Sequence, residues 1–401
     1  MHYSHLTLQI IAWLIALAWV FKFLEAARGL PTISNLLDPE HNLTPAGNPS
    51  LVVIVPGRNE AAGIAACLQS LVDQDLERLQ ILAVNDRSTD QTGAVMAAFA
   101  AAHPAKLTAL TITELPAGWL GKTHAMSLAA HQAIEHHAPD YLLFTDADIV
   151  FAPQILRRSL AYAVKTGADH LVTMPTTLAK SSGEAMLLSF MQVMGILGVR
   201  LWRVADPRVR DTIGVGAFNL IRTPAYLQLG GFDAIPMEIV EDMVLAHRIK
   251  RAGFHQRAAY APGAVAVHWA AGISGILNGL TKNIFAVFRF RPWLLLAAAL
   301  GLALFCIAPI CFLVPAATRI PALVALASVA GLYALNSRTN PVSPWYAVLF
   351  PISAALIVYS MLRSMIVTLA HSGVTWRGTF YPLADLRKQT GQPRTKTAEH
   401  G

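Results

Sequence analysis

Two aspartates follow a short apolar run near the middle of the chain. Tyr141–Phe144 can fill a buried strand, and Thr145, Asp146, Ala147 and Asp148 come directly after it. In open α/β sheets, ligands collect beyond the carboxyl ends of such strands. Alternation places Asp146 and Asp148 on the same side of the backbone, where two hard oxygen ligands can share a divalent cation with substrate phosphates. Asp-x-Asp also occurs in ordinary surface turns, so the surrounding residues must decide between the two interpretations.

Acidic segments also follow two further apolar runs. The runs are 51–55 and 79–84, and the polar segments after them are Pro56-Gly57-Arg58-Asn59-Glu60 and Asn85-Asp86-Arg87-Ser88-Thr89-Asp90. Asn59 or Ser88, taken alone, is explained as the N-cap of the next helix. Three strand ends with carboxylates are harder to explain, because converging acids are costly unless a cation or the donors of a ligand compensate them. We therefore expect a ligand site at this edge of a sheet.

Strand and helix patterns alternate from residue 51 to residue 145. Apolar runs predict strands at 51–55, 79–84, 107–112 and 141–145, and helical spacing or composition predicts helices from residue 64, at 89–102 and at 122–137. Short links between such elements favour βαβ units with right-handed crossovers. The expected fold class is α/β, with a Rossmann-like, mostly parallel sheet.

Composition indicates a membrane protein. The chain has 401 residues, of which 54% are hydrophobic and 14% charged, and its mean hydropathy is +0.47. Soluble domains carry about 25% charged residues. The net charge of +7 comes without a basic tract, so we expect no nucleic-acid partner. The three cysteines have no metal-ligand spacing, and two of them lie in an apolar segment, which predicts a reducing compartment.

Apolar segments lie at both ends of the chain. The domain boundaries that we expect are an amino-terminal transmembrane anchor (1–30), a linker (31–49), a catalytic domain (50–270), an interfacial amphipathic segment (271–292), carboxyl-terminal transmembrane segments (293–370) and a polar tail (371–401). Within the catalytic domain, the apolar segment 186–199 is too short to span, and we expect it in the membrane interface or in the domain interior.

Charges beside the apolar segments predict the topology. Lys22 and Arg28 follow the first segment and no Lys or Arg precedes it, so we expect an outside amino terminus and a cytoplasmic catalytic domain, in a multi-pass protein of the cell inner (cytoplasmic) membrane. The tail contains five basic residues: Arg377, Arg387, Lys388, Arg394 and Lys396. Three crossings after the domain would export them. Either one segment, with the short 320–335 as the first suspect, does not cross, or the tail is exported against the rule.

The ordered set of motifs resembles family 2 of the nucleotide-sugar-dependent glycosyltransferases, which have the GT-A fold. The resemblance covers roughly residues 49–269 and rests on Pro56–Glu60, Asp86–Asp90, Asp146–Asp148, Gly230–Asp233 and Glu241-Asp242. The segment Leu115–Lys122 and the terminal apolar segments look most like the hopanoid-associated (hopene-associated) members, and more distantly like ceramide glucosyltransferases. The tail motif Trp376–Tyr381 also looks like one in membrane members that act on lipids.

This resemblance implies a donor site at the strand ends. The residues it assigns to the donor are Pro56, Asn59, Glu60, Asp86, Lys122 and Asp146. Acceptor groups on Asn59, Glu60 and Asp86 suit a uracil N–H and ribose hydroxyls, so a UDP-sugar is the expected donor. Asp148, with Asp146 near the ribose or the metal, would bind Mg²⁺ or Mn²⁺ on the diphosphate, and Lys122 would add positive charge there.

The same resemblance implies an acceptor side. Gly214, Gly216 and Glu241 are assigned to a loop that contacts donor or acceptor, and the glycines would let the backbone approach closely. A plain turn also explains the glycines. Asp242 would be the general base that takes the proton from the acceptor hydroxyl. Glu241 and Asp242 could equally begin a helix that runs through Arg251, since the helix dipole favours acids there.

One departure and three alternatives remain open. The Q/R-x-x-R-W motif of polymerising members and ceramide glucosyltransferases is absent, and Lys282 is the candidate replacement cation. We therefore expect an inverting, metal-dependent, hexosyltransferase-type enzyme that moves a single sugar to a lipid acceptor, which by resemblance is a hopanoid. The alternatives are a nucleotidyltransferase with the same nucleotide-binding half, a non-catalytic membrane scaffold and a transporter. The scarcity of polar residues in the spans disfavours a transporter.

Overall fold

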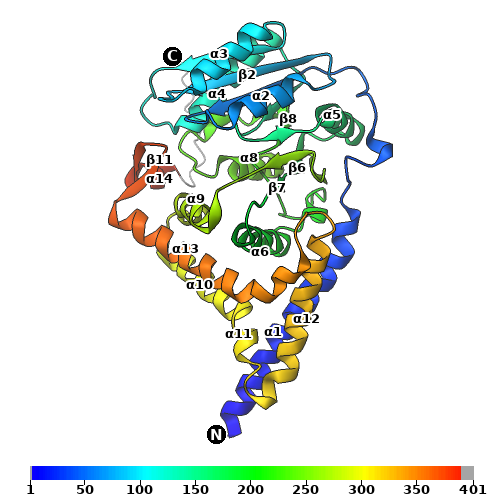
Figure 1. Ribbon diagram of the computed structural model, residues 1–401, viewed down its shortest axis with the longest axis vertical. Coiled ribbons are helices and arrows are strands. Elements are labelled where there is room, and N and C mark those ends of the chain that lie inside the picture. The colour runs from blue at the N-terminus through cyan, green and yellow to red at the C-terminus, as the bar shows by residue number, and fades with distance from the viewer. Residues whose placement is uncertain (1, 390–401) are drawn as a thin grey trace.

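A seven-stranded sheet forms the centre of the computed structural model, which describes residues 2–389 (Figure 1). Its strands in spatial order are β3 (Leu107–Ile112), β2 (Leu79–Asp86), β1 (Leu51–Gly57), β4 (Tyr141–Phe144), β8 (Asn219–Arg222), β6 (His170–Met174) and β9 (Gln256–Tyr260). Strand β8 is antiparallel to both of its neighbours, and the other pairs are parallel. The expected α/β class with a mostly parallel sheet is confirmed.

Helices cover both faces of this sheet. One face packs against α2 (Ile64–Val72), α3 (Thr92–Ala102) and α5 (Ile155–Thr166). The other packs against α4 (Gly121–His137), α7 (Thr223–Gln228) and α8 (Glu241–Arg251). In β1, Val53 and Val55 point to the first group, and Val52 and Ile54 to the second. A strand covered on both faces must be apolar throughout, which explains the continuous runs in the sequence.

Strand register brings the acidic loops together. Ile54 of β1 pairs with Leu82 of β2 and Phe144 of β4, so the loops that follow these three parallel strands meet at one edge. Strand β8 was not expected from the sequence. Because it is antiparallel to β4, with Asn219 beside Phe144, its amino end lies at that same edge. The loop that precedes β8 therefore joins the site from the opposite chain direction.

Two small sheets complete the strand structure. One is formed by β5 (Val150–Phe151), β10 (Val265–Val267) and β7 (Thr176–Thr177), and the other is an antiparallel hairpin of β11 (Gly373–Trp376) and β12 (Thr379–Pro382). The expected linker lies along the domain, where Leu36 N–H donates to the Tyr260 carbonyl over 2.8 Å. The short helix α14 (Leu383–Gln389) follows the hairpin.

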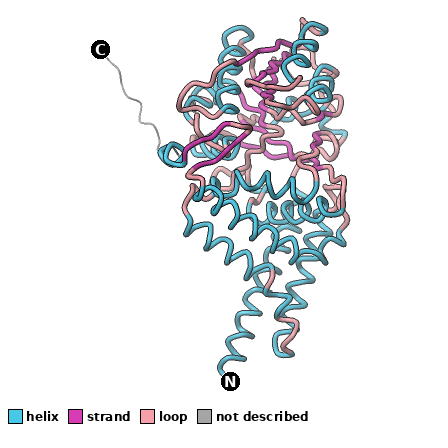
Figure 2. The backbone as a smooth tube through the Cα atoms, turned by 60° about the vertical axis from the view of Figure 1, so that its left-hand side comes forward, coloured by secondary structure: helices cyan, strands magenta, loops and turns pink. Residues whose placement is uncertain are grey.

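Three helical segments form a stalk that projects away from the sheet (Figures 1 and 2). Helix α1 (His2–Gly29) runs beside α12 (Arg319–Asn336), and α10 (Pro292–Cys306) continues through α11 (Ala308–Cys311) toward the same end. Trp19 of α1 stacks on Phe305 of α10 with ring centroids 4.2 Å apart and donates to the Phe305 carbonyl over 2.9 Å. The stalk is therefore held by large apolar and aromatic contacts.

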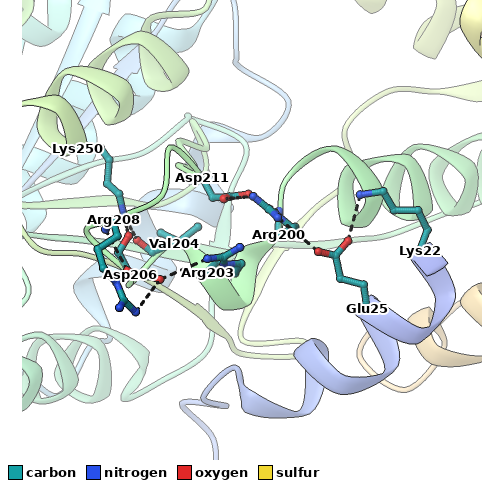
Figure 3. Close-up of polar contacts among 9 residues, drawn as sticks. All are labelled: Lys22, Glu25, Arg200, Arg203, Val204, Asp206, Arg208, Asp211 and Lys250. Atoms are coloured by element: carbon teal, nitrogen blue, oxygen red, sulfur yellow. Dashed lines mark hydrogen bonds and ion pairs between the residues drawn. The ribbon is translucent and has the colours of Figure 1, made fainter. Parts of the chain in front are cut away.

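Ion pairs fasten the carboxyl end of α1 to the domain (Figure 3). Glu25 pairs with Lys22 over 3.1 Å and with Arg200 over 3.5 Å. Arg200 lies just after α6 (Ser182–Gly198) and also pairs with Asp211 over 2.7 Å. Exposed ion pairs contribute little each, but a connected set restrains direction. These ion pairs add to the apolar contacts that α1 makes with α6 and α12.

Within residues 2–389, five helical segments are long and apolar enough to cross a membrane. They are Leu6–Thr32, Ser182–Arg203, Pro292–Cys311, Ala316–Asn336 and Pro344–Ala370. We expected the segment 186–199 to be too short to span a membrane, and this is wrong. The helical segment is longer than 186–199, because α6 begins at Ser182 and is followed by a 3-10 turn (Leu201–Arg203). Large apolar side chains are exposed along α1, α10, α12 and α13 (Phe350–Ala370). Such continuous exposure is typical of a protein associated with a membrane.

Helix α13 lies across the base of the domain and does not follow the stalk (Figure 1). Its buried side combines the small polar residues Ser353, Ser360, Ser364 and Thr368 with the apolar residues Phe350, Ala354 and Met361. Ser364 Oγ accepts from Phe285 N–H of α9 (Gly272–Val287) over 3.1 Å and donates to the Thr281 carbonyl over 2.6 Å. Its opposite side exposes Ile352, Tyr359 and Ile366. The pattern is that of an amphipathic helix docked on the domain.

The structure gives the carboxyl-terminal apolar segments their lengths and directions, and which of them cross a membrane stays a prediction. The suspect segment 320–335 forms the full helix α12 in the stalk, and α13 is the segment that turns aside. Ser353 and Ser364 donate hydrogen bonds to carbonyls of α6 and α9, so α13 is fastened along the domain. The hairpin after α13 therefore returns to the side of the sheet. Residues 390–401, including Arg394 and Lys396, lie outside the described residues.

We predict that the domain and the tail are accessible from the same side of the membrane. Single cysteines at the exposed positions Ala102 and Lys388, with the exposed Cys311 replaced by Ser, should react with a membrane-impermeant maleimide in the same population of sealed vesicles. Cys67 is fully buried, so the maleimide cannot be used on it in place of these positions. Labelling of the two positions from opposite sides would show that α13 crosses the membrane.

Candidate active site

A cavity of about 870 Å³ lies at the edge of the sheet where the acidic loops meet. Its walls come from the ends of β1, β2 and β4, the loop before β8, the start of α8, helices α6 and α9, and the hairpin β11–β12. The charged side chains that line it are Glu60, Asp86, Asp146, Asp148, Glu241, Asp242, Arg58, Lys122, Lys282 and Arg377. Ten charged groups around one cavity suit a highly charged ligand.

Lys122 joins two acids at the centre of this cavity. It lies in the first turn of α4, and its Nζ is 2.6 Å from Asp146 Oδ1 and 2.7 Å from Glu241 Oε1. Burial lowers the pKa of Lys122, but Asp146 and Glu241 reverse that effect and hold it well above its ordinary value. Burial likewise raises the pKa of Asp146, and Lys122 brings it below the usual range. The lysine therefore favours the ionised form of the Asp146 carboxylate.

The pKa of Asp148 shifts in the direction opposite to that of Asp146. No ion pair compensates it among the described residues, and burial, together with the charges of Asp146 and Glu60, raises its pKa to about 6. A cation bound next to this carboxylate would stabilise its charged form. No group of three or more His, Cys, Asp or Glu side chains in the described chain forms a ready metal cage. Two carboxylates fit a divalent cation that takes its other ligands from phosphate and water.

Asp242 lies at the start of α8, beside Glu241. Its Oδ1 accepts from the Met243 N–H over 2.7 Å. Burial first, and then the charge of Glu241, raise the pKa of Asp242 to about 7. A carboxylate with a pKa near neutrality is suited to accept a proton during a reaction. The interpretation of these acids as a helix start is also correct, because α8 spans Glu241–Arg251.

The two glycines before β8 permit close contacts within the site. A Cβ added to Gly214 would lie 2.0 Å from the Asp242 carbonyl oxygen, and one added to Gly216 would lie 2.7 Å from Asp146 Oδ2. Any larger residue would displace the start of α8 or the Asp146 carboxylate. The contact made by these glycines is thus to the acids; contact with a donor or acceptor stays a prediction.

The residues expected around a nucleoside divide into two groups. Pro56, Glu60 and Asp86 line the cavity, and Asp86 forms an ion pair with Arg87 over 2.7 Å. Asn59 is not among the lining residues. Its Oδ1 accepts from Thr89 N–H over 2.8 Å and ties the loop after β1 to the loop after β2. Asn59 therefore braces the two loops, and its contact with a nucleoside remains a prediction.

Sequence reasoning missed the hairpin as part of the site. Arg377 contacts the Glu60 carboxylate and the Arg58 carbonyl, and the Tyr381 hydroxyl accepts from Gly121 N–H over 3.2 Å. More than 300 residues separate Arg377 from Glu60, so no local pattern joins them. The tail motif Trp376–Tyr381 was recognised, but only its similarity to other sequences marked it.

We predict that Gly214→Ala lowers the stability of the protein. Its Cβ would meet backbone that cannot rotate away, and overpacking of this kind costs about 1–3 kcal/mol. Thermal unfolding in detergent should show a lower apparent Tm. Gly301→Ala is the matched control, because a Cβ on this helical glycine of α10 meets open space. An unchanged Tm in Gly214→Ala would show that the loop does not depend on this close approach.

Known proteins resemble this chain in sequence and in fold. Residues 52–223 match the family model for glycosyl transferase family 2. A relative named 4,4'-diaponeurosporenoate glycosyltransferase, from Staphylococcus aureus (strain bovine RF122 / ET3-1), is 26% identical over 199 residues, which are 49% of this chain and 50% of the relative. The protein of that name from strain MRSA252 is 25% identical over the same shares. The chain thus matches about half the length of these relatives.

A solved structure covers more of the chain. The mannosyltransferase PcManGT from Pyrobaculum calidifontis, in complex with GDP-Man and Mn²⁺, has a TM-score of 0.54 and 21% identity, over 90% of this chain and 98% of that one. This likeness shows the fold. Residues 52–223 therefore match glycosyl transferase family 2, within a chain that has a GT-A-like α/β fold and several apolar helices.

Proposed function

We propose that the protein is a membrane-bound, metal-dependent glycosyltransferase that moves one sugar from a nucleotide-diphosphate sugar to a lipid hydroxyl, with inversion at the anomeric carbon. The observation that carries the proposal is the shared cavity. It brings the carboxylates after β4, the candidate base Asp242 and the apolar helices α6 and α9 to one space. A donor, an acceptor hydroxyl and a lipid chain each have a matching wall there.

The donor half of the cavity is polar. Glu60 and Asp86 line it and would accept hydrogen bonds from a nucleoside, and Lys122 and Lys282 would offer positive charge to its diphosphate. Asp148, with Asp146, would hold Mg²⁺ or Mn²⁺, and the bound ion would stabilise the charge that develops on the leaving diphosphate. Lys122 already has two carboxylate partners, so its position is fixed before a donor arrives.

The acceptor half of the cavity is apolar. Met191 and Ile196 of α6 and Leu280 and Val287 of α9 line it, and α9 rests on the amphipathic helix α13. A lipid can lie against this wall with its hydroxyl directed toward Asp242. A hydroxyl is a poor nucleophile until its proton has an acceptor, and a positioned carboxylate contributes roughly 10²–10⁴-fold by taking it. In a single displacement the acceptor oxygen attacks the sugar carbon as the diphosphate leaves, which inverts that carbon. Such a step needs one base for the acceptor hydroxyl and no protein acid for the leaving group.

The names of related proteins support this proposal. The relatives from Staphylococcus aureus are named for a glycosyl transfer involving 4,4'-diaponeurosporenoate, and the mannosyltransferase was solved with GDP-Man and Mn²⁺. They support a lipid-like acceptor and a divalent ion. A UDP-sugar donor and a hopanoid acceptor are the more specific parts of our proposal, and GDP-sugars and carotenoid acids are the alternatives that an assay must include.

The membrane arrangement also belongs to this proposal. The protein lies in the cytoplasmic membrane with α1, the α10–α11 pair and α12 crossing, and with α13 in the interface. Lys22 and Arg28 at the inner end of α1 support a cytoplasmic catalytic domain. With two crossings between the domain and α13, the basic hairpin region stays cytoplasmic, in agreement with the charge rule. Nucleotide sugars are made in that compartment, so the donor has direct access.

The direct test is a transfer assay with purified protein in detergent. Panels of UDP-sugars and GDP-sugars would be incubated with Mn²⁺ and either a hopanoid alcohol, a carotenoid acid or a total lipid extract. We expect one donor to release nucleoside diphosphate faster when a lipid is present, and a glycolipid of inverted configuration to form. Release of pyrophosphate would identify a nucleotidyltransferase, and absence of any turnover across the panel would favour the scaffold interpretation.

We predict that turnover needs a divalent ion held through Asp148. Asp148→Ala should lose most activity with an unchanged Tm, because the replaced side chain has no ion-pair partner. Excess EDTA should stop the wild-type enzyme, and added Mn²⁺ or Mg²⁺ should restore it. Asp73→Ala removes an exposed carboxylate far from the cavity and is the control. Full activity of Asp148→Ala, or of wild type in EDTA, would contradict the metal assignment.

We predict that Asp242 is the base and that its ionisation sets the acid side of the pH profile. Because the carboxylate must be deprotonated to act and its pKa is about 7, kcat should fall as the pH drops below about 7. Asp242→Asn should bind nucleotide with an unchanged Kd, while transfer falls at least about a hundredfold. Near-normal transfer in this variant, or retained anomeric configuration, would exclude the role.

A further inference from the structure

The turn of the hairpin β11–β12 has an unusual backbone. Trp376 pairs with Thr379, so the turn consists of Arg377 and Gly378, with φ of +48° and +78°. Two-residue hairpins need this left-handed geometry at both positions, and residues with short polar side chains or none usually supply it. An arginine there is held against its ordinary backbone preference. Such positions persist where the surroundings fix them, and they gather at functional sites.

Three contacts fasten this hairpin over the cavity. Arg58 donates to Thr379 Oγ1 over 2.9 Å, and Gly121 N–H donates to the Tyr381 hydroxyl over 3.2 Å. The Arg377 guanidinium contacts the Arg58 carbonyl and the Glu60 carboxylate. The first two contacts are enough to dock the hairpin. The third is different, because it places a cation on a carboxylate that the proposed donor site would use.

Positive charges converge where the hairpin meets the cavity. Lys282 lies 4.2 Å from the centroid of the Trp376 ring, and Lys122 is held between Asp146 and Glu241. Burial first, and then the neighbouring charges of Lys122 and Arg377, bring the pKa of Lys282 down to about 8. Arg377 is also close enough to Asp146 to lower the pKa of that carboxyl. Three cations that oppose one another in this way would be stabilised by an anion between them.

We propose that Arg377 is a donor-binding residue that exchanges the Glu60 carboxylate for the diphosphate of the incoming nucleotide sugar. Carboxylate and phosphate present the same pair of oxygens to the planar fork of a guanidinium, so the exchange keeps its hydrogen bonds. It also frees Glu60 to accept from the nucleoside. The inference rests on the proposed function, since it names a further residue of the same donor site.

The hairpin gives this exchange its geometry. Trp376, Arg377 and Tyr381 all line the cavity, and the loops after β1 and before α4 hold the hairpin from two sides. The turn can therefore move its guanidinium between Glu60 and the space beside Lys122 while the strands stay docked. In this scheme the hairpin that follows α13 supplies one wall of the donor site and one of its charges.

The test compares nucleotide binding with and without the diphosphate. Calorimetric titration with Mn²⁺ present would measure UDP, GDP, uridine and guanosine against wild type, Arg377→Gln and Arg377→Lys. Loss of a bidentate charge-assisted contact should raise the Kd of the preferred nucleoside diphosphate about 10- to 100-fold in Arg377→Gln. The Kd of the matching nucleoside should stay the same or fall, because Glu60 is released. Arg377→Lys should recover part of the diphosphate affinity.

Controls separate this inference from the proposed function. Lys388→Gln removes an exposed cation from the helix after the hairpin and should bind like wild type. If Arg377→Gln keeps its Tm and binds the diphosphate like wild type, Arg377 only docks the hairpin and the inference is wrong. An equal loss for nucleoside and diphosphate would also overturn it, since the contact would then not be to phosphate. If wild type binds no nucleotide, the proposed function fails first.

Discussion

The site depends on the ion pairs of Lys122 with Asp146 and Glu241. Six carboxylates line one cavity, and such a group would resist folding without internal cations. Lys122 lies in the first turn of α4 and pairs with one acid after β4 and another at the start of α8. One side chain therefore holds three elements in position. It leaves Asp148 and Asp242 uncompensated, with raised pKa values. The lysine thereby distinguishes the two acids that it pairs with from Asp148 and Asp242, whose charged forms a bound cation or a change of pH can favour.

The loop before β8 shows how tightly this pairing is packed. Gly214 and Gly216 permit that loop to touch Asp242 and Asp146, with no space for a side chain. The loop belongs to an antiparallel strand, which inserts its amino end among the carboxyl ends of parallel neighbours. Acids from distant parts of the sequence can then meet a backbone segment that runs the other way. The mixed direction of the sheet is thus a requirement of the site, because a parallel β8 would bring its other end to this edge.

The central sheet and most of the acids could be predicted from the sequence, because their signals are local. Each of β1, β2 and β4 is a continuous apolar run followed at once by polar residues, so strand, edge and acid appear together. Strand β8 has only four residues and follows an irregular loop, so its direction had no local signal. Arg377 and Glu60 meet only after the chain has passed through every apolar helix. The flat position of α13 depends on Ser364 bonding to α9, which hydropathy does not reveal.

The position of α13 also has a kinetic meaning. By lying beneath α6 and α9, it fixes the height of the cavity relative to the apolar surface of the helices. For the function proposed above, the acceptor then diffuses in two dimensions, and the protein samples it per unit area of bilayer. Its effective concentration is a mole fraction in the lipid phase, so dilution with inert lipid or detergent lowers the rate even at constant bulk concentration. Saturation curves for such a protein are properties of the surface as much as of the binding site.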